Sequence, residues 1–207
     1  MGFVEFSFTK KKIILNNKVV NRLDEFVLTF TSVLDRMKIN YVIVSGYVAI
    51  VFGRSRATED IDIIAEPFGK KKFEEFWSGL EKEFDCINAP NAAQAYDDYI
   101  SQNIALRFFE KGGKPIPNIE FKFPKNTLDE RTLKDRVELL LDGKQLFVSP
   151  IEIQIAFKLF LGSEKDFEDA RHLYKVFAEE ISLAELKSYA KLLKVEEKLG
   201  LAGVKNG

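Results

Sequence analysis

The sequence has very little of the side chains on which several common site chemistries depend. Its 207 residues include a single cysteine, Cys86, and a single histidine, His172. One cysteine cannot form an intrachain disulfide or a cysteine metal cluster, and one histidine excludes histidine-rich metal sites and disfavours Ser-His or Cys-His catalysis. Carboxylates and lysines are therefore the groups from which we expect any catalysis.

Long apolar segments and an excess of one charge are also missing. No apolar run approaches the roughly 18 residues of a membrane span, and residues 1–30 carry neither a signal-peptide core nor a myristoylation motif. The 31 basic and 32 acidic residues give a net charge of −1, so no overall field attracts nucleic acid or membrane. We expect a cytoplasmic protein without membrane contact, in which any basic binding surface is local.

Hydrophobic periodicity predicts an α/β (α+β) fold, with a small mixed sheet flanked by helices and followed by a helical C-terminal part. We expect domains at 1–148 and 149–207. Glycines and prolines at 111–117 predict a hairpin between the two strands that they join. Strands are predicted at 41–46, 61–67, 103–110, 117–123 and 145–149, and helices within 17–38, 47–52, 70–84, 92–100, 150–161, 166–177 and 183–198, with mostly helical structure from 128 onward.

Two acids interrupt one of these apolar strands. In a strand, Asp60 and Asp62 point to the same face, with their carboxylates roughly 6 to 7 Å apart. Two half-buried acids repel each other unless a cation neutralises them, and carboxylate oxygens suit Mg²⁺ or Mn²⁺ better than zinc. The alternative is an edge strand whose acids face water or pair with Arg54 and Arg56.

A glycine turn precedes the acids. Gly46 ends the strand 41–46 and opens a short helix, and the free backbone N–H groups of such a turn favour a phosphate. Ser45 adds a hydroxyl that can bond a phosphate oxygen. An ordinary strand–helix turn is the alternative interpretation of Gly46 alone.

The stretch VSGYVAIVFGRSRATEDIDI, residues 44–63, combines these features. It resembles the nucleotidyltransferases of the DNA polymerase beta superfamily, and it looks most like the AbiEii-type toxins and related minimal nucleotidyltransferases. Gly53, Arg56, Ala57 and Thr58 match the glycine, arginine and small residues that precede the acids there. Ser45 stands where that superfamily usually has a glycine.

The resemblance implies a nucleotidyltransferase fold with a third carboxylate on a neighbouring strand. Glu120 holds that place, so that Asp60, Asp62 and Glu120 would be the catalytic residues and the ligands of Mg²⁺ or Mn²⁺. Ser45 and Gly46 would cradle the phosphates of the nucleotide. The alternative for Glu120 is a solvent-facing side chain that pairs with a nearby lysine, Lys122 or Lys125.

The stretch VSPIEIQIAFKLFLGSEKDFEDARHL, residues 148–173, is similar to later motifs of the AbiEii-type proteins. Its matching positions are Ala156, Lys158, Lys165, Asp166 and Asp169. A lysine on a mainly apolar helix needs an anion, either an acid or a nucleotide phosphate.

For these motifs the resemblance implies nucleotide binding by Lys158, Asp166 and Arg56. A structural ion pair between Lys158 and Asp166, without a ligand, is the alternative. Arg56 could equally pair with Glu59 or Glu66.

The resemblance implies an enzyme, a metal-dependent nucleotidyltransferase that moves a nucleotidyl group from an NTP to RNA, such as a tRNA 3′ end, or to a protein hydroxyl. A toxin–antitoxin setting with a partner toxin or antitoxin is common for such proteins. Ser45 and the lack of an arginine near 163–164 favour an alternative, a catalytically degenerate binding or regulatory module with the same fold. Two further alternatives are an antitoxin that transfers AMP to its partner and an unrelated Mg²⁺-dependent phosphohydrolase.

Overall fold

The computed structural model describes residues 5–9 and 11–204, whose strands form one mixed sheet. The strand order is β1-β2-β8-β9-β3-β4-β7-β6-β5, so that β8 and β9, late in the chain, lie between β2 and β3. The strands are β1 Glu5–Thr9, β2 Lys12–Asn16, β3 Tyr41–Val44, β4 Asp60–Ala65, β5 Phe84–Cys86, β6 Leu106–Glu110, β7 Asn118–Lys122, β8 Val137–Leu141 and β9 Lys144–Val148.

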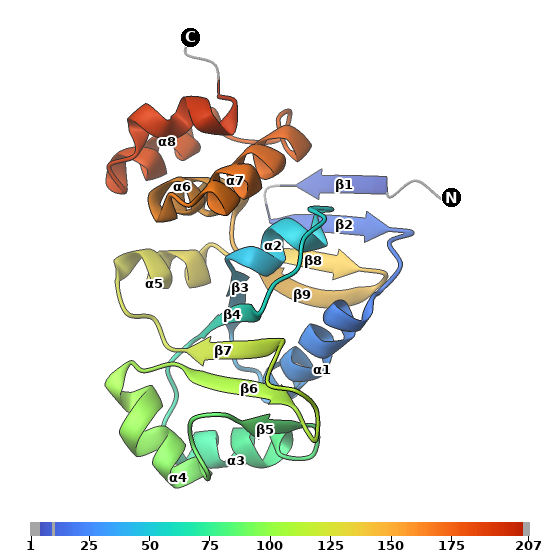
Figure 1. The fold of residues 1–207 in the computed structure, drawn as a ribbon, viewed down its shortest axis with the longest axis vertical. Coiled ribbons are helices and arrows are strands. Elements are labelled where there is room, and N and C mark those ends of the chain that lie inside the picture. Colours follow the sequence, from blue (N-terminus) through green and yellow to red (C-terminus); the bar gives the residue numbers. More distant parts are fainter. Residues whose placement is uncertain (1–4, 10, 205–207) are drawn as a thin grey trace.

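Helices lie around this sheet and at both of its ends (Figure 1). The C-terminal helices α6 to α8 lie at one end of the long axis of the molecule, and α3 and α4 lie at the other (Figure 1). The helices are α1 Arg22–Arg36, α2 Gly46–Val51, α3 Lys70–Leu80, α4 Ala92–Gln94, the π-helical turn η1 Ala95–Tyr99, the 3₁₀ turn η2 Ile100–Gln102, α5 Thr127–Lys134, α6 Ile151–Leu161, α7 Glu164–Val176, α8 Leu183–Leu192 and the 3₁₀ segment η3 Glu196–Ala202.

One face of the sheet carries the main hydrophobic core. Side chains alternate along β4 and β7, so that Ile61, Ile63 and Phe121 are fully buried. Helices α1 and α3 pack against one another and contribute aromatic rings to this core. The ring of Phe30 in α1 lies 5.9 Å from that of Phe76 in α3 and 6.0 Å from that of Phe121. These phenylalanines are core residues, as the sequence favoured.

The opposite face is only partly covered. A small apolar cluster of Val42, Val44, Ile64 and Leu133 forms where α5 contacts β3 and β4. The beginning of β4 lies outside this cluster, and Asp60 at its first position is exposed. Polar side chains on this part of the sheet therefore reach solvent.

The elements differ from the sequence-based expectation in several places. Val137–Leu141 forms the strand β8, where we predicted helix, because it pairs parallel with β2 and antiparallel with β9. Strands β1, β2 and β5 were not predicted either, so the sheet is larger than expected. The helices α3 and α8 end earlier than predicted, at Leu80 and Leu192. The mixed α/β class and the hairpin of β6 and β7 are as predicted.

Within residues 5–9 and 11–204, none of the helices combines the length and apolarity that crossing a membrane requires. Strand β9 ends at Val148 and α6 begins at Ile151. A domain boundary between them stays a prediction.

Candidate active site

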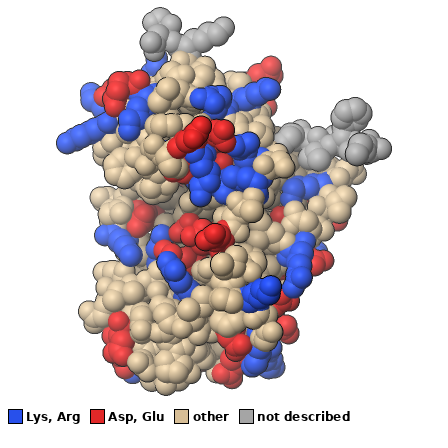
Figure 2. All heavy atoms as spheres, viewed as in Figure 1, with Lys and Arg blue, Asp and Glu red and all other residues tan. Residues whose placement is uncertain are grey.

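The three predicted acids lie on one face of two neighbouring strands. Asp62 in β4 and Glu120 in β7 are direct partners in the parallel register, and Asp60, two residues before Asp62, shares their face. The side chains of Asp62 and Glu120 are 17% and 20% exposed. In Figure 2, acidic side chains gather in the middle of the molecule, at the height of β4 and β7 in Figure 1, with basic side chains above and below.

A lysine lies between two of these acids. Lys122 Nζ is 3.3 Å from Asp62 Oδ1 and 3.7 Å from Glu120 Oε1. Arg107 Nη2 donates to the other oxygen of Glu120 at 3.3 Å. The pairing of Glu120 with Lys122 is one of the two pairings that the sequence left open for Glu120. Asp62 pairs with the same lysine and not with Arg54 or Arg56.

The ligand atoms of the three acids suit a divalent cation, but their side chains do not converge on one point in this structure. Asp60, Asp62 and Glu120 offer only carboxylate oxygens, the donors that Mg²⁺ and Mn²⁺ prefer. Burial raises the pKa of Asp62 although Lys122 lowers it, so the carboxylate is short of positive charge. Within the described part of the chain, no three His, Cys, Asp or Glu side chains converge as metal ligands. The donors are suitable, and an ammonium group lies between two of them.

A cavity of about 260 Å³ adjoins Asp62. Its apolar lining includes Ile64 of β4 and Phe157 of α6, and its polar lining includes Ser45 and Lys122. The cavity therefore connects Asp62 with the turn after β3 and with the C-terminal helix α6, as expected of a ligand pocket with a few polar groups.

The turn between β3 and α2 is held in a strained conformation. Ser45 has φ 64° and ψ −133°, a region that glycine adopts far more readily than serine. Gln154 of α6 holds this residue on both sides, because Ser45 N donates to Gln154 Oε1 at 3.1 Å and Gln154 Nε2 donates to Ser45 O at 2.6 Å. Ser149 Oγ donates to the same Oε1 at 2.9 Å. Strain of this kind persists only where neighbouring groups fix it, and it is common at functional sites.

Gly46 lies where a side chain would meet the loop before Asp60. A Cβ atom at this position would lie 2.8 Å from Arg56 Nη2 and 3.2 Å from Thr58 Oγ1. The loop that leads to Asp60 therefore lies directly against the turn, and a larger residue at position 46 would push it away.

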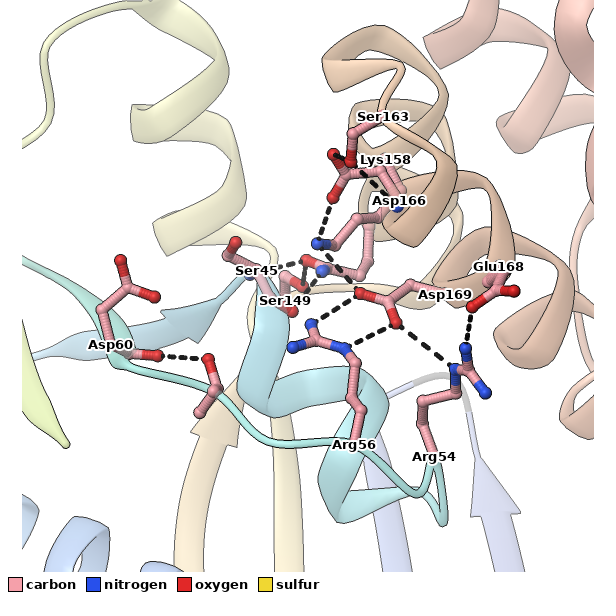
Figure 3. A network of polar contacts seen from close by, with 12 residues as sticks. Ser45, Arg54, Arg56, Asp60, Ser149, Lys158, Ser163, Asp166, Glu168 and Asp169 are labelled. Carbon is pink, nitrogen blue, oxygen red and sulfur yellow. Dashed lines mark hydrogen bonds and ion pairs between the residues drawn. The ribbon is translucent and has the colours of Figure 1, made fainter. Parts of the chain in front are cut away.

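A buried network of ion pairs ties this loop to α6 and α7 (Figure 3). The fully buried carboxylate of Asp169 accepts from Arg56 Nε at 2.9 Å and Nη2 at 2.7 Å, and Lys158 Nζ lies 3.1 Å away. Lys158 also donates to Asp166 Oδ1 at 2.7 Å, and Ser163 Oγ donates to Asp166 Oδ2 at 2.5 Å. Burial alone would raise the pKa of Asp166, but these hydrogen bonds outweigh it and lower the pKa.

The predicted nucleotide-binding residues thus fall into two groups. Ser45 lines the cavity, and Gly46 lies beside it in the same turn. The lining residues of the cavity do not include Arg56, Lys158 or Asp166. Lys158 binds Asp166, and both Lys158 and Arg56 contact Asp169.

The ion pair of Lys158 with Asp166 is the alternative that the sequence left open. The suggested pairing of Arg56 with Glu59 or Glu66 is wrong, since Arg56 binds Asp169. Asp169 received no role from the sequence. Its spacing of three residues from Asp166 puts both acids on one side of α7. This spacing could have predicted that Asp169 contacts the same lysine as Asp166.

Comparisons with known proteins identify the fold. The structure matches an antigenic nucleotidyltransferase-like protein from Paracoccidioides brasiliensis with a TM-score of 0.54 and 15% sequence identity, over 90% of this chain and 95% of that one. The solution structure of the antibiotic-resistance factor ANT(2'')-Ia matches with a TM-score of 0.49 and 10% identity, over 86% and 96%. No protein-family model and no curated protein sequence matches the chain. The match with a TM-score of 0.54 shows that the protein has a nucleotidyltransferase fold. Its AbiEii-type resemblance stays a prediction.

The strain at Ser45 predicts a stabilising substitution. Ser45→Gly should raise the free energy of unfolding by about 1 kcal/mol, because it removes the cost of a positive φ. Ser55→Gly is the matched control, since Ser55 is exposed and is not a positive-φ residue. Urea denaturation measures both changes. An equal loss of stability in the two variants would contradict the assignment of strain to Ser45.

The ionised carboxylate of Asp62 should lower the free energy of unfolding. Asp62→Asn should raise the free energy of unfolding at pH 7 by about 0.5–2 kcal/mol, the range typical of single stabilising substitutions. Burial raises the folded-state pKa of Asp62 above its usual 3.8. The penalty of the ionised carboxylate is therefore present at neutral pH and disappears as the pH falls through the raised pKa towards 3.8.

Denaturation curves of Asp62→Asn across this pH range test the expectation, with the exposed neighbour variant Glu59→Gln as the control. A destabilised Asp62→Asn variant at pH 7 would mean that the ion pair with Lys122 outweighs the cost of burial.

Asp169 should be essential for folding stability. Asp169→Ala should lower the free energy of unfolding by about 3–5 kcal/mol, because it leaves Arg56 and Lys158 buried without a shared anion. Glu168→Ala, which removes only the exposed partner of Arg54, should cost less than about 1 kcal/mol. Thermal and urea denaturation compare the two variants, and similar losses would argue against a central role for Asp169.

Proposed function

We propose that the protein is a metal-dependent nucleotidyltransferase that transfers a nucleotidyl group from an NTP to an acceptor hydroxyl. The observation that carries this proposal is the environment of Asp62. This carboxylate is largely buried, lies beside a cavity, faces Glu120 in register and is close to the strained turn at Ser45. Each of these features has a folding cost, and perturbed acids in a cavity are candidates for catalysis.

The proposed roles follow from the position of each residue. Asp60, Asp62 and Glu120 would hold Mg²⁺ or Mn²⁺, which supplies positive charge to the triphosphate and to the leaving pyrophosphate. The Ser45–Gly46 turn would bind phosphate oxygens, and the apolar wall of the cavity would hold the nucleoside.

Glu120 would accept the proton of the acceptor hydroxyl. The acceptor oxygen then bonds to the α-phosphorus as the bond from that phosphorus to pyrophosphate breaks. Arg56, Lys158 and Asp166 would contribute to nucleotide binding through the position that their network gives to the loop before Asp60.

The acceptor in this proposal is an RNA, such as a tRNA 3′ end, or a hydroxyl of a partner toxin or antitoxin protein. Incubation with each α-labelled NTP, with tRNA in one arm and with co-purifying protein in the other, distinguishes the two acceptors. Label on RNA supports the first, and label on protein supports the second.

Calorimetric titration tests the nucleotide site directly. We expect at least one of the four NTPs to bind to the wild type in the presence of Mg²⁺, and Asp60→Asn/Asp62→Asn to lose this metal-dependent binding while remaining folded. Glu59→Gln, which changes an exposed acid next to the pair, should bind as the wild type does. Equal binding by the double variant would refute a role for these acids in holding the metal.

One observation favours the rival proposal of a degenerate module. Lys122 lies between Asp62 and Glu120 and could replace the metal as a permanent counter-ion of the acids. This rival expects no effect of Mg²⁺ on nucleotide affinity and no label on either acceptor. Metal-dependent binding followed by transfer would exclude it.

A further inference from the structure

The cation that faces the cavity is not the one that the sequence motifs suggested. Lys122 follows the buried Phe121 in β7 and shares a face with Glu120. It lines the same cavity as Asp62 and Ser45, and its side chain is 19% exposed. A ligand in this cavity therefore meets the ammonium group of Lys122.

The other two candidate cations, Lys158 and Arg56, are bound to carboxylates of the protein. The side chain of Lys158 is 2% exposed and contacts two carboxylates, and that of Arg56 is 11% exposed and binds Asp169 through two nitrogen atoms. Moving either cation to a ligand would leave Asp169 buried with less compensation, which is strongly unfavourable.

The contacts of Lys122 are looser. Its distances of 3.3 Å to Asp62 and 3.7 Å to Glu120 exceed the roughly 2.7–2.9 Å of strong charge-assisted hydrogen bonds. Lys158 by contrast lies 2.7 Å from Asp166. A flexible lysine side chain held by long contacts can turn to another anion once a second cation neutralises its carboxylate partners.

We propose that Lys122 is the lysine that contacts the phosphates of the nucleotide, and that Lys158 has a structural role. This inference rests on the proposed function. When a cation neutralises Asp62 and Glu120, Lys122 is free to bind a phosphate oxygen in the adjoining cavity. The triphosphate thus receives positive charge from both the metal and this lysine.

Calorimetry with the NTP that the wild type binds best, in the presence of Mg²⁺, tests the assignment. Lys122→Met should weaken NTP binding about tenfold to a hundredfold, as expected for the loss of one charged hydrogen bond. Lys122→Arg should restore part of the affinity because it keeps the charge. Lys125→Met removes an exposed lysine three residues away and should bind as the wild type does.

A second titration separates phosphate contact from a general structural effect. The corresponding nucleoside, which has no phosphate, should bind to Lys122→Met as it does to the wild type, and thermal denaturation should show that the variant is folded. Equal loss of nucleoside and NTP affinity would overturn the assignment.

Two further outcomes distinguish this inference from the proposed function. Unchanged NTP affinity in Lys122→Met, with normal binding by the wild type, overturns the role of Lys122 alone. A folded Lys158→Met variant that loses affinity for the NTP but not for the nucleoside overturns the structural role of Lys158. No NTP binding by the wild type overturns the proposed function and this inference together.

Discussion

The contact of Asp169 with Arg56 and Lys158 is the interaction on which the shape of the candidate site depends. It joins α7, the loop before β4 and α6 through one fully buried carboxylate. Buried charges without partners are expensive, so these three segments keep their positions together. Because Arg56 also lies against Gly46, the same contact fixes the turn after β3. The acids of β4 and the turn after β3 are thus held in position by residues that do not line the cavity.

The features with a folding cost lie together on one side of the sheet. Ser45 keeps a strained conformation because Gln154 bonds its backbone on both sides. Asp62 is largely buried, with a loosely held lysine as its counter-ion. The other side of β4 and β7 carries buried isoleucine and phenylalanine side chains. A protein tends to keep local violations of packing and charge rules where function needs them. The distribution of these costs therefore indicates a ligand site more clearly than any single residue does.

Patterns of short range in the sequence predicted much of this arrangement. The period of two in a strand put Asp60 and Asp62 on one face and Glu120 on the equivalent face of its own strand. The apolar surroundings of Lys158 required an anion nearby. Contacts between distant segments were not predictable in the same way, since Arg56 and Asp169 are 113 residues apart. The apolar run VELLL became β8 rather than helix because β2, far away in the chain, offered it a partner, and a local pattern does not contain that information.

The likeness to the solved nucleotidyltransferase-like structure from Paracoccidioides brasiliensis shows the fold, and a shared fold alone does not define a function. The structure match also includes much of the helical C-terminal part. Residues 1–148 are less than three quarters of the 207 residues, so a match over 90% of the chain extends well into 149–207. The site agrees with this, because Gln154 of α6 holds the Ser45 turn and Phe157 of α6 lines the cavity beside Asp62. The C-terminal helices are therefore part of the candidate site, and a chain ending at residue 148 would lack both the residue that fixes the turn and one wall of the cavity.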